Sequence, residues 1–183
     1  MATNSSQAAF QNADLSLAVT AGVYHDIQHF LFREALLLDH RRFDEWAELL
    51  APDVVFRMPA RFAREIGLEP PAGVDYFHDD RRAITAKIKL LQEKLASDGA
   101  QPLRATQTRR FITNVIVCPC NRDEYSVLSY LLLTRSSPGE APSTVFTAER
   151  YDHLRGGART MRIVRREIVM DQRNANVDID MYL

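Results

Sequence analysis

Residues 103–135 read LRATQTRRFITNVIVCPCNRDEYSVLSYLLLTR, and this stretch decides the fold class. Two parts of it, Leu103 to Cys118 and Glu124 to Arg135, are rich in the β-branched and aromatic side chains that favour strands. Between them, Pro119 to Asp123 has the composition of a turn. The stretch therefore predicts two long strands joined by a short connection, which favours antiparallel pairing.

The same pattern continues toward the C-terminus. Ser143 to Arg155 and Met161 to Gln172 are two further predicted strands, and Ser136 to Pro142 separates the first of them from the stretch above. The last turn contains Gly156 and Gly157, which tolerate the positive φ that a tight hairpin demands. Four successive strands joined by short turns predict an antiparallel meander.

Helical periodicity dominates the part of the chain that precedes this stretch. Gly22 to Asp39 places apolar residues at spacings of three, four and seven, as an amphipathic helix does. A shorter helix is predicted for Phe43 to Leu50, and a third begins at Asp79 or Asp80, either of which can cap it. Gly99 is well placed to end this third helix.

Residues between the second and third helices predict a short strand and a loop. Asp53 to Phe62 alternates with a period of two, but Pro59 limits its pairing and favours a position near an edge. Residues 64–78 lack periodicity and predict a loop. Helices followed by long strands give an α+β protein with a curved sheet wrapped around its helices. We expect a flexible N-terminal arm over residues 1–21 and a single domain over residues 22–183.

The composition is that of a globular domain, with 46% hydrophobic and 26% charged residues. A net charge of -1 gives no broad attraction to nucleic acid or to an anionic membrane. No apolar run approaches the roughly 18–20 residues that a bilayer span requires. The first 17 residues lack the basic start and apolar centre of a secretory signal. We therefore expect a cytoplasmic protein whose partners are neither nucleic acid nor membrane.

Metal-binding patterns are weak in this sequence. His25 and His29 are four residues apart on a helix, a spacing that suits one metal ion, but no third ligand is indicated. Cys118 and Cys120 are too few for a site built on thiolates, and no histidine follows them as a Rieske cluster requires. We expect no metal or cofactor in this chain.

Two groups of polar residues leave alternatives open. An α+β protein with a hollow interior can be an enzyme, and the candidate residues for proton transfer are Tyr24, Asp39, His40, Tyr125 and Asp171. Arginines also occur inside predicted strands, where β-branched residues are usually preferred: Arg109, Arg110, Arg165 and Arg166. These arginines either extend from a solvated strand face or make contacts between subunits.

Six sequence blocks resemble the β (small) subunits of aromatic-ring-hydroxylating dioxygenases. In chain order they are FLFREALLLD at 30–39, FDEW at 43–46, MPAR at 58–61, TRRFITNV at 108–115, ERYD at 149–152 and RREIVMDQ at 165–172. The blocks are colinear over residues 22–172, so together they are far more specific than any one of them.

The resemblance implies a cystatin-like cone, in which N-terminal helices pack on a curved, mainly antiparallel sheet. It implies a structural subunit of the terminal oxygenase component of a multicomponent dioxygenase that cis-dihydroxylates aromatic rings in catabolism. Three copies would form a trimer beneath three α subunits (α3β3), and each α subunit would carry a Rieske [2Fe-2S] cluster and a mononuclear iron. This chain would then supply no catalytic residue, and Arg61 joins the four strand arginines as a candidate for subunit contacts.

The same cone is shared with isomerases and dehydratases. The alternative hypothesis is therefore a stand-alone dehydratase or isomerase that works through Tyr24, Asp39 or His40.

Overall fold

The structure is a computed structural model that describes residues 6–14, 16–59, 75–97, 99, 101, 105–139 and 143–172. Arg61 and most of the predicted loop at 64–78 lie outside the described residues.

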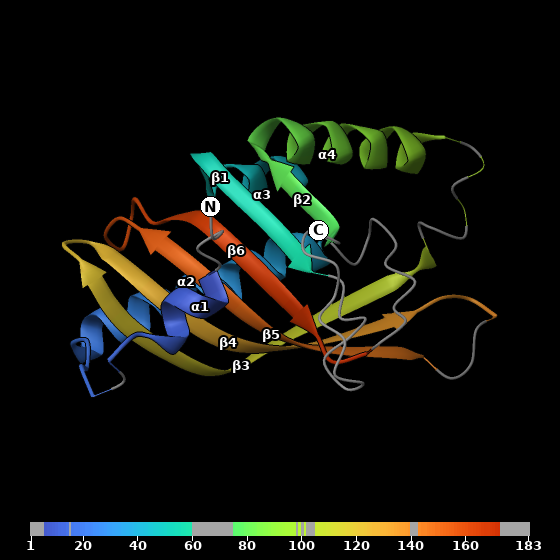
Figure 1. Ribbon diagram of the computed structural model, residues 1–183. Coiled ribbons are helices and arrows are strands. Elements are labelled where there is room, and N and C mark those ends of the chain that lie inside the picture. The colour runs from blue at the N-terminus through green and yellow to red at the C-terminus, as the bar shows by residue number, and fades with distance from the viewer. Residues whose placement is uncertain are drawn as a thin grey trace.

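One six-stranded sheet forms the body of the protein (Figure 1). Its strands are β1 (Leu50–Pro59), β2 (Asp75–Asp80), β3 (Gln107–Asn121), β4 (Glu124–Ser136), β5 (Thr144–Arg155) and β6 (Arg162–Met170). The spatial order is β2-β1-β6-β5-β4-β3. Strands β3 to β6 form the predicted antiparallel meander, whereas β1 pairs with β6 in parallel. The sheet is thus mainly antiparallel, as expected.

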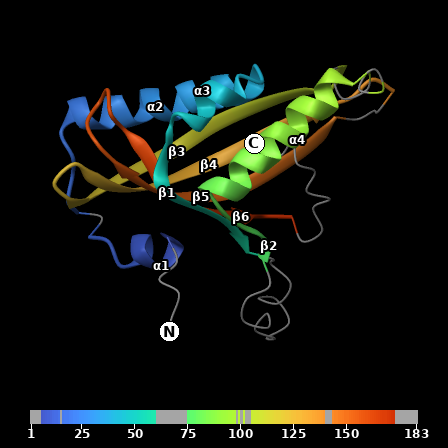
Figure 2. The same ribbon diagram turned by 90° about the horizontal axis from the view of Figure 1, so that it is seen from above.

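Helices lie on both faces of this sheet. They are α1 (Ser6–Gln11), α2 (Ala21–Asp39), α3 (Phe43–Ala47) and α4 (Arg81–Ala96). Helix α1 and the long helix α2 lie on opposite faces (Figures 1 and 2). We call the face toward α2 the inner face and the face toward α1 the outer face. None of the helices in the described ranges is long and apolar enough to cross a membrane.

The two longest helices begin where the sequence offers an oxygen that can cap them. The Thr20 hydroxyl accepts a hydrogen bond from the backbone N–H of Val23, at 3.3 Å. The Asp80 carboxylate accepts one from the backbone N–H of Ala83, at 2.8 Å. Each bond satisfies a backbone donor that has no partner within the first turn of its helix. The sequence predicts Asp79 or Asp80 as the cap of the third helix, and the structure shows that Asp80 caps α4.

The turn between β5 and β6 depends on one of its two glycines. Gly156 has a φ of 113°, and a Cβ added there would lie 2.6 Å from the carbonyl oxygen of Thr160. Its N–H donates to the carbonyl oxygen of Asp123, at 2.7 Å, so this turn also contacts the β3–β4 turn. Gly157 has no such restriction, because a Cβ there would meet no atom within 4 Å.

The main hydrophobic core fills the space between the inner face and helices α2, α3 and α4. Fully buried members come from every layer, including Ile27, Leu31, Trp46, Phe56, Ile84, Leu154 and Ile163. The rings of Trp46 and Phe56 meet edge to face, with centroids 5.9 Å apart. Burying these side chains supplies most of the favourable free energy of folding.

Several elements differ from the sequence predictions, and the helix predicted for Phe43 to Leu50 ends at Ala47. Strand β2 occupies Asp75–Asp80, although the sequence predicts a loop for part of this range. The loop prediction follows from the polar composition of DYFHDD, of whose six residues only one is buried. Strand β2 forms one edge of the sheet, and β1, the strand predicted near an edge, is the next strand inward. Helix α1 lies within the expected N-terminal arm, and its Phe10 is buried against Tyr151 with ring centroids 5.8 Å apart. The flexibility of that arm stays a prediction.

Candidate functional site

A network of charged side chains is buried between α2 and strands β5 and β6. Arg166 donates hydrogen bonds to both carboxylate oxygens of Glu34 and, at 2.6 and 3.0 Å, to both oxygens of Asp152. The indole N–H of Trp46 donates to Glu34 Oε1 at 3.1 Å. Arg150 lies 3.4 Å from Glu34 and 3.3 Å from Asp152. Two guanidiniums thus face two carboxylates, so this cluster buries no net charge.

The charges in this network determine its pKa values. Burial alone would raise the pKa of Glu34, but Arg166 and Arg150 outweigh burial and lower that pKa from 4.5 to about 2. Burial opposes the charge on Arg166 in the same way, yet Asp152 and Glu34 raise the pKa of Arg166 overall. Burial and the nearby charge of Arg166 lower the pKa of Arg150. Glu34 and Arg166 therefore remain ionised at neutral pH.

A second buried ion pair joins the end of α2 to strand β3. Asp39 Oδ1 accepts from the Arg110 guanidinium at 2.7 Å, and Asp39 Oδ2 accepts from the Arg110 backbone N–H at 3.0 Å. Each of these side chains is only 4% exposed. Both charged sites inside the cone therefore connect a helix to the sheet, which is a structural role.

The outer face of the sheet is less well covered. Large apolar side chains of β3, β4 and β5 are between 38% and 50% exposed there: Phe111, Ile116, Tyr130, Leu132 and Val145. Strand pairing places Phe111 next to Leu132 and Leu132 next to Thr147. Helix α1 covers only the neighbouring part of this face, where Phe10 packs with Cys118, Tyr151 and Val169. We call the five exposed apolar residues the outer patch.

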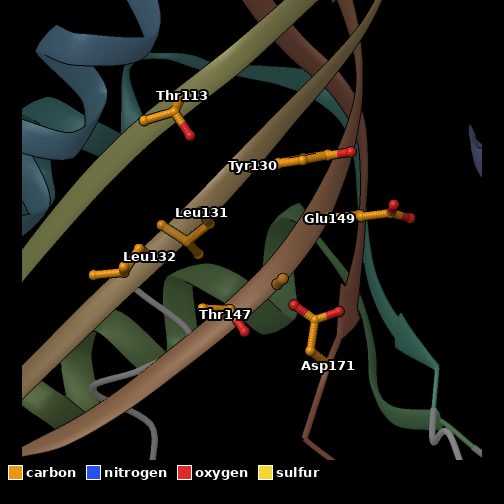
Figure 3. Close-up of a pocket in the computed structure, with 8 residues that line it drawn as sticks. Thr113, Tyr130, Leu131, Leu132, Thr147, Glu149 and Asp171 are labelled. Carbon is orange, nitrogen blue, oxygen red and sulfur yellow. The ribbon is translucent and has the colours of Figure 1, made fainter.

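A hollow of about 400 Å³ opens beside the outer patch. Its lining includes Tyr130, Leu132, Thr147, Glu149 and Asp171, and the side chains of Tyr130, Glu149 and Asp171 extend to the same side of the strands (Figure 3). Glu149 accepts a hydrogen bond from the Tyr151 hydroxyl at 2.7 Å. Burial, together with this bond, raises the pKa of Tyr151 to about 12. The hollow thus combines apolar walls with two carboxylates.

The strand arginines divide into two groups. Arg110 and Arg166 are buried and pair with carboxylates of their own chain, so they do not lie on the surface of the described chain. Arg165 is exposed, and the Arg109 side chain is 58% exposed. A contact with another subunit stays a prediction for Arg109 and Arg165.

The residues considered for proton transfer lie apart. Tyr24 and Asp39 are 15 residues apart on one helix, which corresponds to roughly 22 Å. The Tyr24 hydroxyl donates to the carbonyl oxygen of Val115 at 3.0 Å, and Asp39 is held by Arg110. His40 is exposed at the end of α2, and Asp171 lies on the other face of the sheet. The structure therefore does not bring Tyr24, Asp39 and Asp171 together as an acid–base site.

The histidine pair on α2 gains no further ligand. His25 and His29 are both exposed. Within the described ranges, no group of three or more His, Cys, Asp or Glu side chains is arranged to hold a metal ion.

Sequence reasoning missed most of the buried ion network, although signals for it exist. Glu34 lies three residues after Leu31 and four before Leu38, on the apolar stripe of α2. Arg150 and Asp152 lie at a spacing of two between the buried residues Ala148 and Leu154, on the same face of β5. A charged residue at a position that the period assigns to the core indicates a buried ion pair.

Comparison with known proteins identifies the family. Residues 33–176 match the ring hydroxylating beta subunit family. The benzene 1,2-dioxygenase subunit beta of Pseudomonas putida is 36% identical over 171 residues, covering 87% of this chain and 90% of that protein. The biphenyl 2,3-dioxygenase subunit beta of Rhodococcus jostii is 34% identical over 161 residues, covering 84% of each chain.

A solved structure confirms the fold. A chain of naphthalene 1,2-dioxygenase, with indole bound in that enzyme's active site, superposes with a TM-score of 0.74 at 19% identity. The superposition covers 87% of this chain and 84% of the other. The sequence match extends over most of the chain and agrees with this fold. The chain therefore belongs to the family of ring-hydroxylating dioxygenase β subunits.

Proposed function

We propose that this chain is the structural subunit of the terminal oxygenase component of a Rieske non-haem iron dioxygenase. The complete enzyme would cis-dihydroxylate aromatic rings in a catabolic pathway of the cytoplasm. Its α subunit would carry the [2Fe-2S] cluster and the mononuclear iron, and this chain would hold the α subunits in place. The expected assembly is α3β3, built on a trimer of this chain.

The observation that supports this role most strongly is the buried ion network. In the cone interior, the acidic and basic groups of Glu34, Asp152 and Arg166 are bound to one another. Groups held in this way join helices to the sheet and are poorly placed to exchange protons with a substrate. They connect α2 to strands β5 and β6.

The family relationship supports the choice of partner. The relatives named above are β subunits of dioxygenases for benzene and biphenyl, which implies a second kind of subunit in each enzyme. A subunit binds its partners through exposed surfaces. Among the predicted contact residues that the structure describes, Arg109 and Arg165 are exposed.

The dehydratase or isomerase alternative is less well supported. Its candidate residues are Tyr24, Asp39 and His40. Tyr24 and Asp39 lie near opposite ends of α2, so these two cannot act together on one substrate.

Co-expression with a Rieske-type α subunit of this family tests the proposal. A tag on this chain alone should recover both subunits in equal amounts, with an iron content that matches the number of α subunits. Failure of the two chains to purify together would contradict the proposed function. A matched preparation of this chain without the α subunit should contain no stoichiometric iron.

A further inference from the structure

We infer that a buried water molecule binds between Arg150 of β5 and Ser129 of β4, inside the cone. The site lies on the inner face of the sheet, toward helix α2, and is separate from the outer patch. The inference concerns the interior of this chain and does not depend on the proposed function.

Arg150 is a buried cation whose hydrogen-bonding groups are only partly used. Its side chain is 3% exposed, and its nitrogens lie 3.4 Å from Glu34 and 3.3 Å from Asp152. The Nε and Nη2 atoms of Arg150 nevertheless make no aligned hydrogen bond to any residue that the structure describes. Arg166, which is buried to the same degree, donates to the same two carboxylates through all three of its nitrogens. A buried N–H group without an acceptor is costly, so Arg150 requires a further acceptor.

Ser129 supplies a second polar group without a partner. Its side chain is fully buried, and its hydroxyl makes no hydrogen bond within the described part of the chain. Ser129 and Arg150 are directly paired across β4 and β5, so their Cβ atoms lie on one face, roughly 5 Å apart. That face is the inner one, because Arg150 approaches Glu34 of α2. Two polar groups that lack partners are therefore neighbours in the core.

An irregularity in β3 leaves space and further polar groups beside Ser129. The register of β3 and β4 shifts at this point, so that Asn114 and Val115 together oppose Ser129 alone. Asn114 has a φ of 50°, and a bulge of this kind disrupts the ladder of hydrogen bonds and bends the strand. The carbonyl oxygen of Val115 accepts from the Tyr24 hydroxyl of α2 at 3.0 Å, so this carbonyl is directed toward the inner face. The bulge thus makes the surroundings of Ser129 polar and loosely paired.

The chemistry of the site favours a neutral ligand that can both donate and accept. A water molecule can accept from Arg150 and share a hydrogen bond with the Ser129 hydroxyl, and buried waters typically make about three such bonds. Two arginines and two carboxylates already balance in this network, so an anion would leave an uncompensated buried charge. Burial lowers the pKa of Arg150, as expected for a guanidinium that is short of acceptors. The water would extend the buried ion network from β5 to β4.

NMR spectroscopy of the isotope-labelled, full-length chain tests the inference in solution. Cross-relaxation between water and an arginine Nε–H proton reports a water molecule held within hydrogen-bonding distance. The Nε–H of Arg150 should show a cross-peak to water, and Arg150→Lys assigns this signal by removing it. Arg166 is the matched control, because its side chain is also 3% exposed but its Nε–H donates to Asp152 at 2.6 Å. The Nε–H of Arg166 should show no such cross-peak. Equal cross-peaks on both arginines, or none on either, would overturn the inference.

A crystal structure of the same chain locates the ligand directly. The electron density should show a water within about 3.2 Å of both Ser129 Oγ and a nitrogen of Arg150. Crystals grown in bromide should show no anomalous peak at this position. A bromide peak there would identify an anion site, and a direct hydrogen bond between Arg150 and Ser129 would leave no place for the water. Either result contradicts the inference.

Substitutions at Ser129 test the placement of the water. Ser129→Val puts a branched apolar side chain where the water would lie, so the Arg150 cross-peak should disappear. The equilibrium constant for urea unfolding should then rise about tenfold or more, because Arg150 loses an acceptor. Ser129→Ala leaves room for the water, so the cross-peak should persist and the constant should rise only about fivefold. A cross-peak that survives in Ser129→Val would show that the water lies elsewhere. The wild-type spectra and crystal decide the question even if Ser129→Val does not fold.

Discussion

Glu34 occupies a helical position that is usually reserved for an apolar side chain. It is fully buried, and a carboxylate can remain charged there only because Arg166 and Arg150 compensate its lost hydration. The sequence indicates that Glu34 is buried, because it lies three residues after Leu31 and four before Leu38. It cannot indicate the partner, because Arg166 is 132 residues away and meets Glu34 only once the sheet has formed.

Replacing Arg166 by methionine should destabilise the chain strongly. The change keeps much of the apolar volume but leaves Glu34 and Asp152 buried without their main cation, which typically costs about 3–5 kcal/mol. Urea unfolding followed by circular dichroism measures the loss. Arg122→Met is the matched control, because the Arg122 side chain is 97% exposed, and it should change stability by less than about 1 kcal/mol. Equal stability of the two variants would show that the buried network contributes little.

The lowered pKa of Glu34 predicts how the free energy of unfolding depends on pH. Its pKa is about 2 in the folded chain and 4.5 ordinarily, so its stabilising contribution is complete above about pH 4.5 and is lost as the pH falls toward 2. A shift of this size corresponds to about 3 kcal/mol. Glu34→Gln should be less stable than the wild type at pH 7, and the difference should shrink between pH 4.5 and 2. A constant difference across this range in urea unfolding would contradict the assigned pKa.

At the scale of elements, the sequence predicts those helices and strands that depend mainly on interactions between neighbouring residues. The helices at α2 and α4 and the four strands from β3 to β6 follow from periodicity, capping residues and turn composition. Strand β2 was missed because DYFHDD has neither alternation nor an apolar run, and it becomes a strand only by pairing with β1. The parallel pairing of β1 with β6 is equally invisible locally, since it joins residues more than 100 positions apart.

The β5–β6 turn offers a test with an internal control. Gly156→Ala should destabilise the chain by about 1–3 kcal/mol, because its φ is 113° and the new Cβ would lie 2.6 Å from the Thr160 carbonyl oxygen. Gly157→Ala meets no atom within 4 Å and should be nearly neutral. Thermal unfolding of both variants gives the comparison, and a Gly156→Ala variant as stable as Gly157→Ala would refute this view of the turn.

For the whole molecule, the fold class and the family follow from the sequence, whereas the outer patch does not. Phe111 and Ile116 are five residues apart, so simple alternation would place them on opposite faces of β3. An irregularity between Thr113 and Ile116, with Asn114 at a φ of 50°, shifts the register and brings both side chains to the outer face. Whether these side chains lie on the outer face therefore depends on a backbone feature that the residue pattern does not predict.

The central claim is that this chain supports catalysis carried out by another subunit. The most direct test is a reconstitution assay that measures oxidation of an aromatic substrate, with an electron donor and oxygen supplied, by this chain, by the α subunit and by both together. We predict the highest turnover when both are present, and none from this chain alone even when ferrous iron is added. Iron-dependent turnover by the purified chain without any α subunit would contradict the account.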